Sequence, residues 1–305
     1  MRKLKNIFVV LEAGQEEQPA LERAAFIAEA TGSSLHLFMC AYDRAVGIAT
    51  FLSRSQRSTF AQTIVDGSRV MVERLAEPLT EKEIDFRIEI VWDRHPLDAI
   101  IAAVGTGDYG LLMKYCRHST GVDRMFNHID WSLMRYSPCP VMLVKKGQWD
   151  EVGQVLAAID AAPENELHEK LNMEILDRAS YLAAELNFEL HLVSAYPAPP
   201  VYVPVSQVSS SLTNYRSKMS HMVIENLNKL GEEYGVLEEH QHAIEGPVDW
   251  VIPKVSNDIV AEFVVMGNVS RESLTGISIG STAESILDQL DTNVMMVRIS
   301  EQPES

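Results

Sequence analysis

One set of motifs occurs twice along the chain, in the same order, and this internal repeat limits what the chain can fold into. Each half begins with an apolar run that ends in an acid, Ile7–Glu12 and Val155–Asp160. With these, the matches are spaced by 148 to 155 residues, and they include 35–37 with 190–192, 96–98 with 247–249, and 141–144 with 294–297. The repeat predicts two copies of one small unit.

Within each copy, apolar runs alternate with amphipathic segments, which predicts strands and helices in turn. One helical segment of the second half has apolar residues at helical spacing, namely Ile175, Ala179, Leu182, Ala183 and Leu186. The runs 263–266 and 294–297 are apolar throughout, as expected for strands covered on both faces. We therefore predict an α/β protein with two tandem doubly wound, mostly parallel five-stranded sheets, in domains 1–146 and 153–305 joined by a polar linker.

Charge is distributed unevenly between the halves of this chain, whose net charge is −17. Residues 1–150 contain 18 basic and 19 acidic residues, which leaves 8 basic and 24 acidic residues for the remainder. Such an acidic half repels polyanions, so we expect no nucleic-acid partner. No apolar run reaches the roughly 18 residues of a spanning helix, so we expect no membrane partner. The widely spaced Cys40, Cys116 and Cys139 indicate a reduced, cytoplasmic protein.

A glycine- and serine-containing segment follows the strand predicted at 263–266. It contains Gly267, Ser270 and Arg271, and nine residues separate Ser270 from the run Gly280-Ser281-Thr282. Gly267 would let the backbone turn tightly. The residues from Gly280 onward begin a predicted helix, whose free N–H groups suit a phosphate. Ser281 with Glu284 also fits a capping box, a structural role that needs no ligand.

This segment resembles the signature of the universal stress protein family: glycine, two residues, glycine, nine residues, glycine, then serine or threonine. Ser270 stands where that signature has its second glycine. Other features that fit the family are the strand-end Asp160, the pair Gly246-Pro247, and the stretches 18–24, 130–135, 137–141 and 293–297. The resemblance covers the whole chain as two tandem domains, and it is closest to the tandem-domain UspE type.

The resemblance implies a Rossmann-like fold of the adenine nucleotide α-hydrolase type, and adenine-nucleotide binding without catalysis. Asp160 would contact the adenine or ribose of ATP or a related nucleotide, while Gly267, Gly280 and Ser281 would hold its phosphates. Ser270 and Thr282 lie in the same segment, and Arg271 supplies its nearest positive charge, to which Mg²⁺ would add. We therefore expect a nucleotide site in the second domain.

The first half lacks this loop. By the repeat, Lys114 stands in place of Gly267, Arg117 in place of Ser270, Asn127 in place of Gly280 and His128 in place of Ser281, and the strand-end acid is Glu12. One interpretation is a new anion site at Lys114, Arg117 and Arg124. The other, which we favour, is a degenerate structural domain whose basic residues are solvated.

Two other features carry weaker hypotheses. His240 and His242 lie on a predicted strand and face the same side, as two metal ligands would, but solvated histidines at a sheet edge are the simpler interpretation. The stretch 197–205 is rich in proline and apolar residues, and it either walls an apolar ligand pocket or covers the sheet. No recognisable catalytic motif occurs.

The resemblance implies a stress-response regulator that binds a small molecule, an adenine nucleotide, in its second domain, and the cysteine pattern adds the expectation of a cytoplasmic protein. The alternative is a carrier or interaction protein with an apolar pocket at the strand ends. The final apolar strands, 141–144 and 294–297, are expected to pair and to join the two domains in an intramolecular pseudo-dimer, since exposed strand edges tend to pair. A homodimer remains open.

Overall fold

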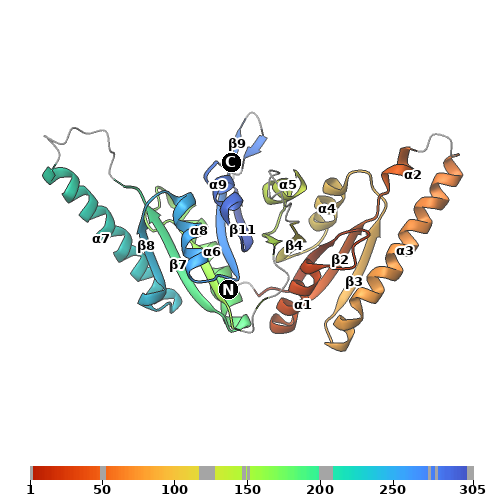
Figure 1. Ribbon diagram of the computed structural model, residues 1–305, viewed down its shortest axis with the longest axis horizontal. Helices are drawn as coiled ribbons and strands as arrows, with labels where there is room; N and C mark the ends of the chain where they lie inside the picture. Colours follow the sequence, from red (N-terminus) through yellow and green to blue (C-terminus); the bar gives the residue numbers. More distant parts are fainter. Residues whose placement is uncertain are drawn as a thin grey trace. The chain divides into compact units, whose positions relative to one another are not determined.

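Short apolar strands alternate with helices throughout the computed structural model (Figure 1). The structure describes residues 3–48, 53–116, 128–145, 149, 152–198, 209–273, 276–278 and 281–300. The chain divides into two units, Arg2–Trp149 and Asp150–Ser305, called here the first and second unit. No helix among the described residues combines the length and the apolar character needed to cross a membrane.

The first unit is a parallel sheet in the order β3-β2-β1-β4-β5. Its elements are β1 (Asn6–Leu11), α1 (Pro19–Thr31), β2 (Ser34–Cys40), α2 (Arg44–Ile48), α3 (Arg54–Glu81), β3 (Phe86–Val91), α4 (Pro96–Gly105), β4 (Leu111–Tyr115), α5 (His128–Tyr136) and β5 (Val141–Val144). Figure 1 shows the long helix α3 running beside β3.

The second unit repeats this order as β8-β7-β6-β9-β11. Its elements are β6 (Gln154–Ala158), α6 (Glu166–Leu186), β7 (Glu189–Tyr196), α7 (Ser209–Tyr234), the 3₁₀ helix η2 (Glu238–His240), β8 (Gln241–Glu245), α8 (Val248–Asp258), β9 (Phe263–Ser273), β10 (Gly276–Ser278), α9 (Ser281–Gln289) and β11 (Asn293–Ser300). The predicted fold class, with two mostly parallel five-stranded sheets, is confirmed, and β10 adds an antiparallel hairpin to β9.

The apolar patterns explain why these elements form. The central strands β1 and β6 are buried on both faces, because helices cover both sides of a doubly wound sheet. The predicted apolar face of α6 is buried along its length, at Ile175, Ala179, Leu182, Ala183 and Leu186. Gly32 ends α1 in the left-handed conformation, with φ of 68°, where a residue without a β-carbon is favoured. Burial and capping therefore agree with the sequence pattern.

Trp149 holds the end of the first unit against its own helix α1. Its ring centroid lies 5.7 Å from that of Phe26, edge to face. The guanidinium carbon of Arg23 lies 5.0 Å from the same ring. These contacts bury all but 9% of the tryptophan and fix where the chain leaves the first unit.

Candidate functional site

In each unit the order of the strands reverses between two central neighbours, β1 and β4 in the first, β6 and β9 in the second. The carboxyl ends of such strands border the crevice where open α/β sheets bind ligands. Glu12 follows β1 at this edge, and Asp160 lies just beyond β6. The two strand-end acids therefore lie at the ligand edge of their own units, as the sequence predicted.

Asp160 is exposed, and its backbone is held in place by α6. The side-chain oxygen of Asn172 accepts a hydrogen bond from the Asp160 N–H (3.0 Å), and its amide nitrogen donates to the Asp160 carbonyl (2.6 Å). The carboxylate Oδ1 of Asp160 accepts from the N–H of Ala162 at 2.9 Å. An amide bracket of this kind satisfies the strand-end peptide groups and leaves the carboxylate facing solvent.

Two further side chains fix the turn after Asp160. The Ala161 N–H donates to the hydroxyl of Ser194 on β7 at 3.0 Å, and the amide of Asn226 on α7 donates to the Ala161 carbonyl at 2.8 Å. Sequence analysis missed Asn172, Ser194 and Asn226. Only Ser194 offered a signal, because it is a polar residue within the otherwise apolar run 192–195.

The expectation of a tight turn at Gly267 is wrong. Gly267 lies within β9, which continues to Ser273 and pairs Gly267 with Val297 of β11. A β-carbon at Gly267 would lie only 2.6 Å from Cδ1 of Leu171, which is itself 8% exposed. The missing side chain therefore makes room for Leu171 of α6 rather than for a backbone turn.

For some of the remaining predicted site residues, the structure describes only the position of the backbone. The predicted helix at 281 is present as α9, and the Ser285 hydroxyl ties it to α8 by donating to Asp249 at 2.8 Å. Ser270 and Arg271 belong to β9, and Ser281 and Thr282 begin α9, but their side chains are not described. Gly280 and residues 199–205 of the predicted apolar stretch lie outside the described residues.

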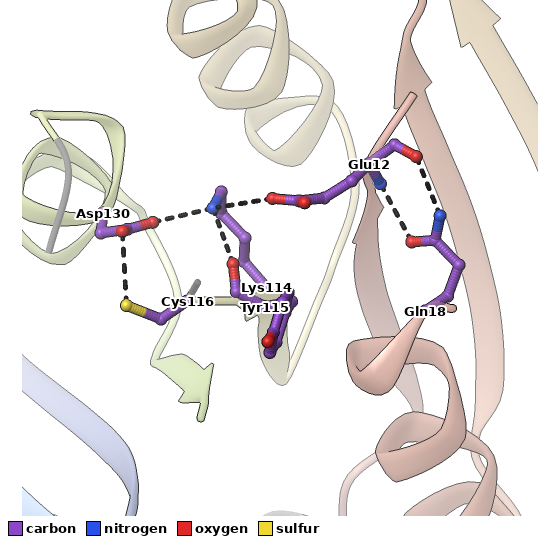
Figure 2. Close-up of polar contacts among 6 residues, drawn as sticks. All are labelled: Glu12, Gln18, Lys114, Tyr115, Cys116 and Asp130. Atoms are coloured by element: carbon purple, nitrogen blue, oxygen red, sulfur yellow. Dashed lines mark hydrogen bonds and ion pairs between the residues drawn. The ribbon is translucent and has the colours of Figure 1, made fainter. Parts of the chain in front are cut away.

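The corresponding region of the first unit is filled by a buried ion-pair network (Figure 2). The ammonium of Lys114 lies 2.9 Å from Asp130 Oδ1 on α5 and 3.8 Å from Glu12 Oε1, and it donates to the Tyr115 carbonyl at 2.8 Å. Lys114 is 5% exposed and Asp130 is fully buried. Neither sequence interpretation of Lys114 holds, because the side chain is not solvated and two carboxylates already surround its charge.

The backbone of Glu12 is bracketed as that of Asp160 is, but by a different residue. The side-chain oxygen of Gln18 accepts from the Glu12 N–H at 3.0 Å, and its amide donates to the Glu12 carbonyl at 2.8 Å. Gln18 precedes α1, whereas Asn172 lies inside α6. The same backbone bracket is thus built from different positions in the repeat.

Strand registers correct the predicted equivalence of Lys114 and Gly267. Leu112 pairs with Val141 in the first unit, and Val264 pairs with Val294 in the second. Counting along the strands from these pairs, Lys114 corresponds to Met266 and Tyr115 to Gly267. The directions of the side chains agree, since Lys114 points to α5 whereas a side chain at Gly267 would point to α6. Arg117, Arg124 and Asn127 lie outside the described residues.

Cys116 completes the network of the first unit. Its thiol donates to Asp130 Oδ2 across 3.6 Å, and burial, reinforced by the nearby Asp130 charge, raises the pKa of Cys116 to about 12. The thiol is therefore protonated at neutral pH. Cys40, Cys116 and Cys139 form no disulfide with one another.

The expectation of solvated histidines at 240 and 242 is also wrong. Both are partly buried, and they flank a third histidine, His191 of β7. The rings of His191 and His240 stack with centroids 4.1 Å apart, and His191 Nδ1 lies 3.0 Å from His242 Nε2. The repeat places His36 of the first unit at the position of His191, and its neighbours there are Glu89, Arg87 and Tyr109 instead.

Comparison with known proteins decides the family. The sequence model described as "Universal stress protein family" matches residues 3–145 and again residues 154–298. The chain belongs to the universal stress protein family. It is of the tandem E type: it is 30% identical to universal stress protein E of Photorhabdus laumondii over 303 residues, 98% of this chain and 96% of the relative. It is 31% identical to the universal stress protein E homolog of Haemophilus influenzae over 306 residues, 98% of this chain and 99% of the relative.

Solved structures of universal stress proteins share the fold over nearly the whole chain. A putative universal stress protein from Pseudomonas aeruginosa UCBPP-PA14 is 29% identical, with a TM-score of 0.74 over 97% of this chain and 93% of that one. A universal stress protein from Archaeoglobus fulgidus, at 15% identity, has a TM-score of 0.65 over 95% of this chain and 98% of that one. The fold is therefore shared by proteins of quite different sequence.

Proposed function

We propose that this tandem universal stress protein is a non-catalytic, cytoplasmic stress-response regulator whose second unit binds ATP or another adenine nucleotide. The observation that carries the proposal is the contrast between the two strand-end acids. Asp160 is exposed at the ligand edge of its sheet, with its backbone already fixed by Asn172. Glu12, at the same edge of the first unit, lies against the buried ammonium of Lys114.

Asp160 suits the sugar or base end of a nucleotide. A carboxylate accepts hydrogen bonds from ribose hydroxyls or from the adenine amino group. Because the hydrogen bonds of Asn172 hold the backbone before any ligand arrives, little conformational freedom would be lost on binding. The proposed phosphate contacts are Gly267, Ser270, Arg271, Gly280, Ser281 and Thr282, with Mg²⁺ offsetting the charge of the acidic second unit. The start of α9 at Ser281 favours the phosphate end there, since the first N–H groups of a helix attract anions.

The test is nucleotide binding by the full chain, measured by isothermal titration calorimetry with ATP, ADP and AMP, with and without Mg²⁺. Asp160→Asn should weaken binding by about tenfold or more, the equivalent of one charge-assisted hydrogen bond. Glu164→Gln removes an exposed acid nearby and serves as the matched control. The proposal fails if Asp160→Asn binds as the parent does, or if native mass spectrometry finds an apolar ligand retained instead.

We propose further that the units form an intramolecular pseudo-dimer through their last strands. Within its own unit, each of β5 and β11 ends the row of five parallel strands. An apolar strand at the end of a sheet offers unpaired peptide groups to a second strand, and a short linker keeps that strand at a high effective concentration. Small-angle scattering of the monomer tests this: a profile of two independently moving units would contradict it.

A further inference from the structure

Four side chains gather at the amino ends of β7 and β8 in the second unit, at the opposite edge of the sheet from Asp160. Glu189 is the first residue of β7 and His191 the third, His240 is the last residue of η2, and His242 is the second residue of β8. One ligand atom from each of Glu189, His191 and His240 lies within 4.8 Å of the others. His240 Nε2 is 4.0 Å from Glu189 Oε2.

His191 is the buried centre of this group. It is 5% exposed, and its Nε2 has no hydrogen-bond partner among the described residues. In the tautomer in which Nδ1–H donates to His242 Nε2, at 3.0 Å, the lone pair of His191 Nε2 is unused. A buried polar atom without a partner is costly, and a metal ion would satisfy it.

We propose that Glu189, His191 and His240 form a binding site for Zn²⁺ or a similar divalent transition metal ion. Two imidazole nitrogens and one carboxylate are a ligand set that Zn²⁺ accepts, with water as the fourth ligand. Bonds of about 2.0–2.2 Å require the three ligand atoms to close to about 3.4 Å from one another. The His240 ring has to turn out of its stack on His191 for its lone pair to reach the same ion; its side chain is 19% exposed and that of Glu189 57% exposed, so both lie where they can move.

His242 acts as the orienting residue rather than as a ligand. A metal-bound histidine normally has its second ring nitrogen engaged by a hydrogen bond, which fixes the ring and its tautomer. His242 provides that partner to His191 Nδ1. The acidic character of the second half also favours the approach of a cation.

The first unit shows what the same histidine position looks like without such a site. His36 Nε2 lies 2.9 Å from Glu89, and His36 Nδ1 lies 2.6 Å from the Tyr109 hydroxyl and 3.0 Å from Arg87 Nη2. Thus Nδ1 is hydrogen-bonded, Nε2 faces a carboxylate oxygen, and a guanidinium stands beside the ring. A cation is repelled there, so the metal site belongs to the second unit alone.

The experiment is a Zn²⁺ titration of the full chain after dialysis against a chelator, with binding followed by calorimetry and by the visible absorption of Co²⁺ as a substitute ion. We expect one ion per chain and a higher Tm in the presence of Zn²⁺, because the ion binds only the folded form. His240→Ala and Glu189→Gln should each weaken Zn²⁺ binding by at least tenfold and change the Co²⁺ spectrum. Both residues are at the surface edge of the cluster, so the fold should persist.

Three controls separate this site from others. His221→Ala removes an exposed histidine of α7, and Glu89→Gln removes the acid beside His36, so both should bind Zn²⁺ as the parent does. Asp160→Asn should also retain Zn²⁺, which distinguishes failure of the metal site from failure of the nucleotide proposal. The proposal is overturned if the parent binds no Zn²⁺, or if His240→Ala and Glu189→Gln bind it unchanged.

Discussion

In the first unit the acid after the opening strand lies 3.8 Å from a lysine that is 5% exposed, whereas in the second unit the equivalent acid is exposed to solvent. The lysine position holds Met266 in the second unit, and the position of Asp130, the third residue of its helix, holds Ala283. An ion pair in one copy therefore replaces two small or apolar residues in the other. The residues at these two positions therefore decide whether the strand-end acid lies beside a buried charge.

The histidine at the third residue of the second strand in each unit gives a second contrast. His36 is paired with an acid, a tyrosine and an arginine, whereas His191 is surrounded by two histidines with Glu189 close by. The backbone positions are the same, and the neighbours differ in charge. In both comparisons the fold fixes where the acid or the histidine lies. The side chains that contact it from other helices and strands decide whether it is paired or available to a ligand.

The largest effect is expected from Lys114→Met, which puts the residue of the second unit into the first. Asp130, fully buried, would lose its ion pair at 2.9 Å. Breaking one partner of a buried pair costs about 3–5 kcal/mol, because the remaining charge stays away from water. Urea unfolding, with hydrogen exchange to report on each unit, measures the loss in the free energy of unfolding.

The double variant Lys114→Met with Asp130→Ala sharpens this comparison. It reproduces the pair Met266 and Ala283, and it should recover most of the lost stability, since apolar replacement of a buried ion pair is often neutral. Lys82→Met is the matched control: Lys82 pairs with Glu29 at the surface, where such pairs are worth less than about 1 kcal/mol. Equal losses for Lys114→Met and Lys82→Met would contradict the role assigned to the buried pair.

A smaller effect is expected from acid, and it should be similar in the two units. The pKa of His191 is lowered to about 4 by burial and by His240 and His242, and that of His36 to about 4 by burial and Arg87. The unfolded chain, with a histidine pKa of about 6.5, then binds more protons between pH 6.5 and 4. Stability is therefore highest above pH 6.5 and falls as the pH drops towards 4, by about 2 kcal/mol at pH 5 for His191.

Both units should respond to a similar extent. Glu89 lies 2.9 Å from His36 Nε2, yet the pKa of His36 is lowered as far as that of His191. Metal-free protein, followed by hydrogen exchange at pH 7 and pH 5, tests this for both units at once. His191→Gln should flatten the pH dependence of the second unit; an unchanged slope would show that His191 is not the group responsible.

The fold followed from the repeat because long apolar runs, buried on both faces, leave few alternatives. The equivalence of Lys114 was wrong by one residue, and in a strand such a slip sends a side chain to the other face. The spacing between the repeats is 152 residues at β4 but 153 at α5, so a single-residue change in length between them misled the alignment.

The chemistry of the sites was harder to predict than the fold. Lys114 can be buried because Glu12, which follows β1, and Asp130 of α5 lie beside its ammonium group. No local pattern near Lys114 in the sequence indicates either partner. His191 likewise meets His240 and His242 only through the pairing of β7 with β8. Asp160 was found because a strand-end acid is a local pattern, whereas Asn172 acts on it from inside a helix twelve positions later.

The smallest effect concerns how the helix after each strand-end acid begins. Asn165 caps α6, and its side-chain oxygen accepts from the N–H groups of Leu167 (3.0 Å) and His168 (3.1 Å). Gln18 occupies the cap position of α1 but makes no capping bond there, since its side chain brackets Glu12 instead. In the second unit the two tasks are divided between Asn165 and Asn172, so capping can be removed without disturbing the acid.

Asn165→Ala should therefore lower the free energy of unfolding of the second unit by about 1 kcal/mol, the usual cost of losing a cap. Asn165→Asp keeps an acceptor oxygen at the start of the helix and should retain most of the stability. Nucleotide binding should stay within about twofold of the parent in both variants, because Asn172 still holds Asp160. Urea unfolding and calorimetry on the same samples measure the two quantities. If Asn165→Ala lost as much nucleotide affinity as Asp160→Asn, the cap and the hydrogen bonds of Asn172 would act together. The division of tasks inferred from α1 and α6 would then be wrong.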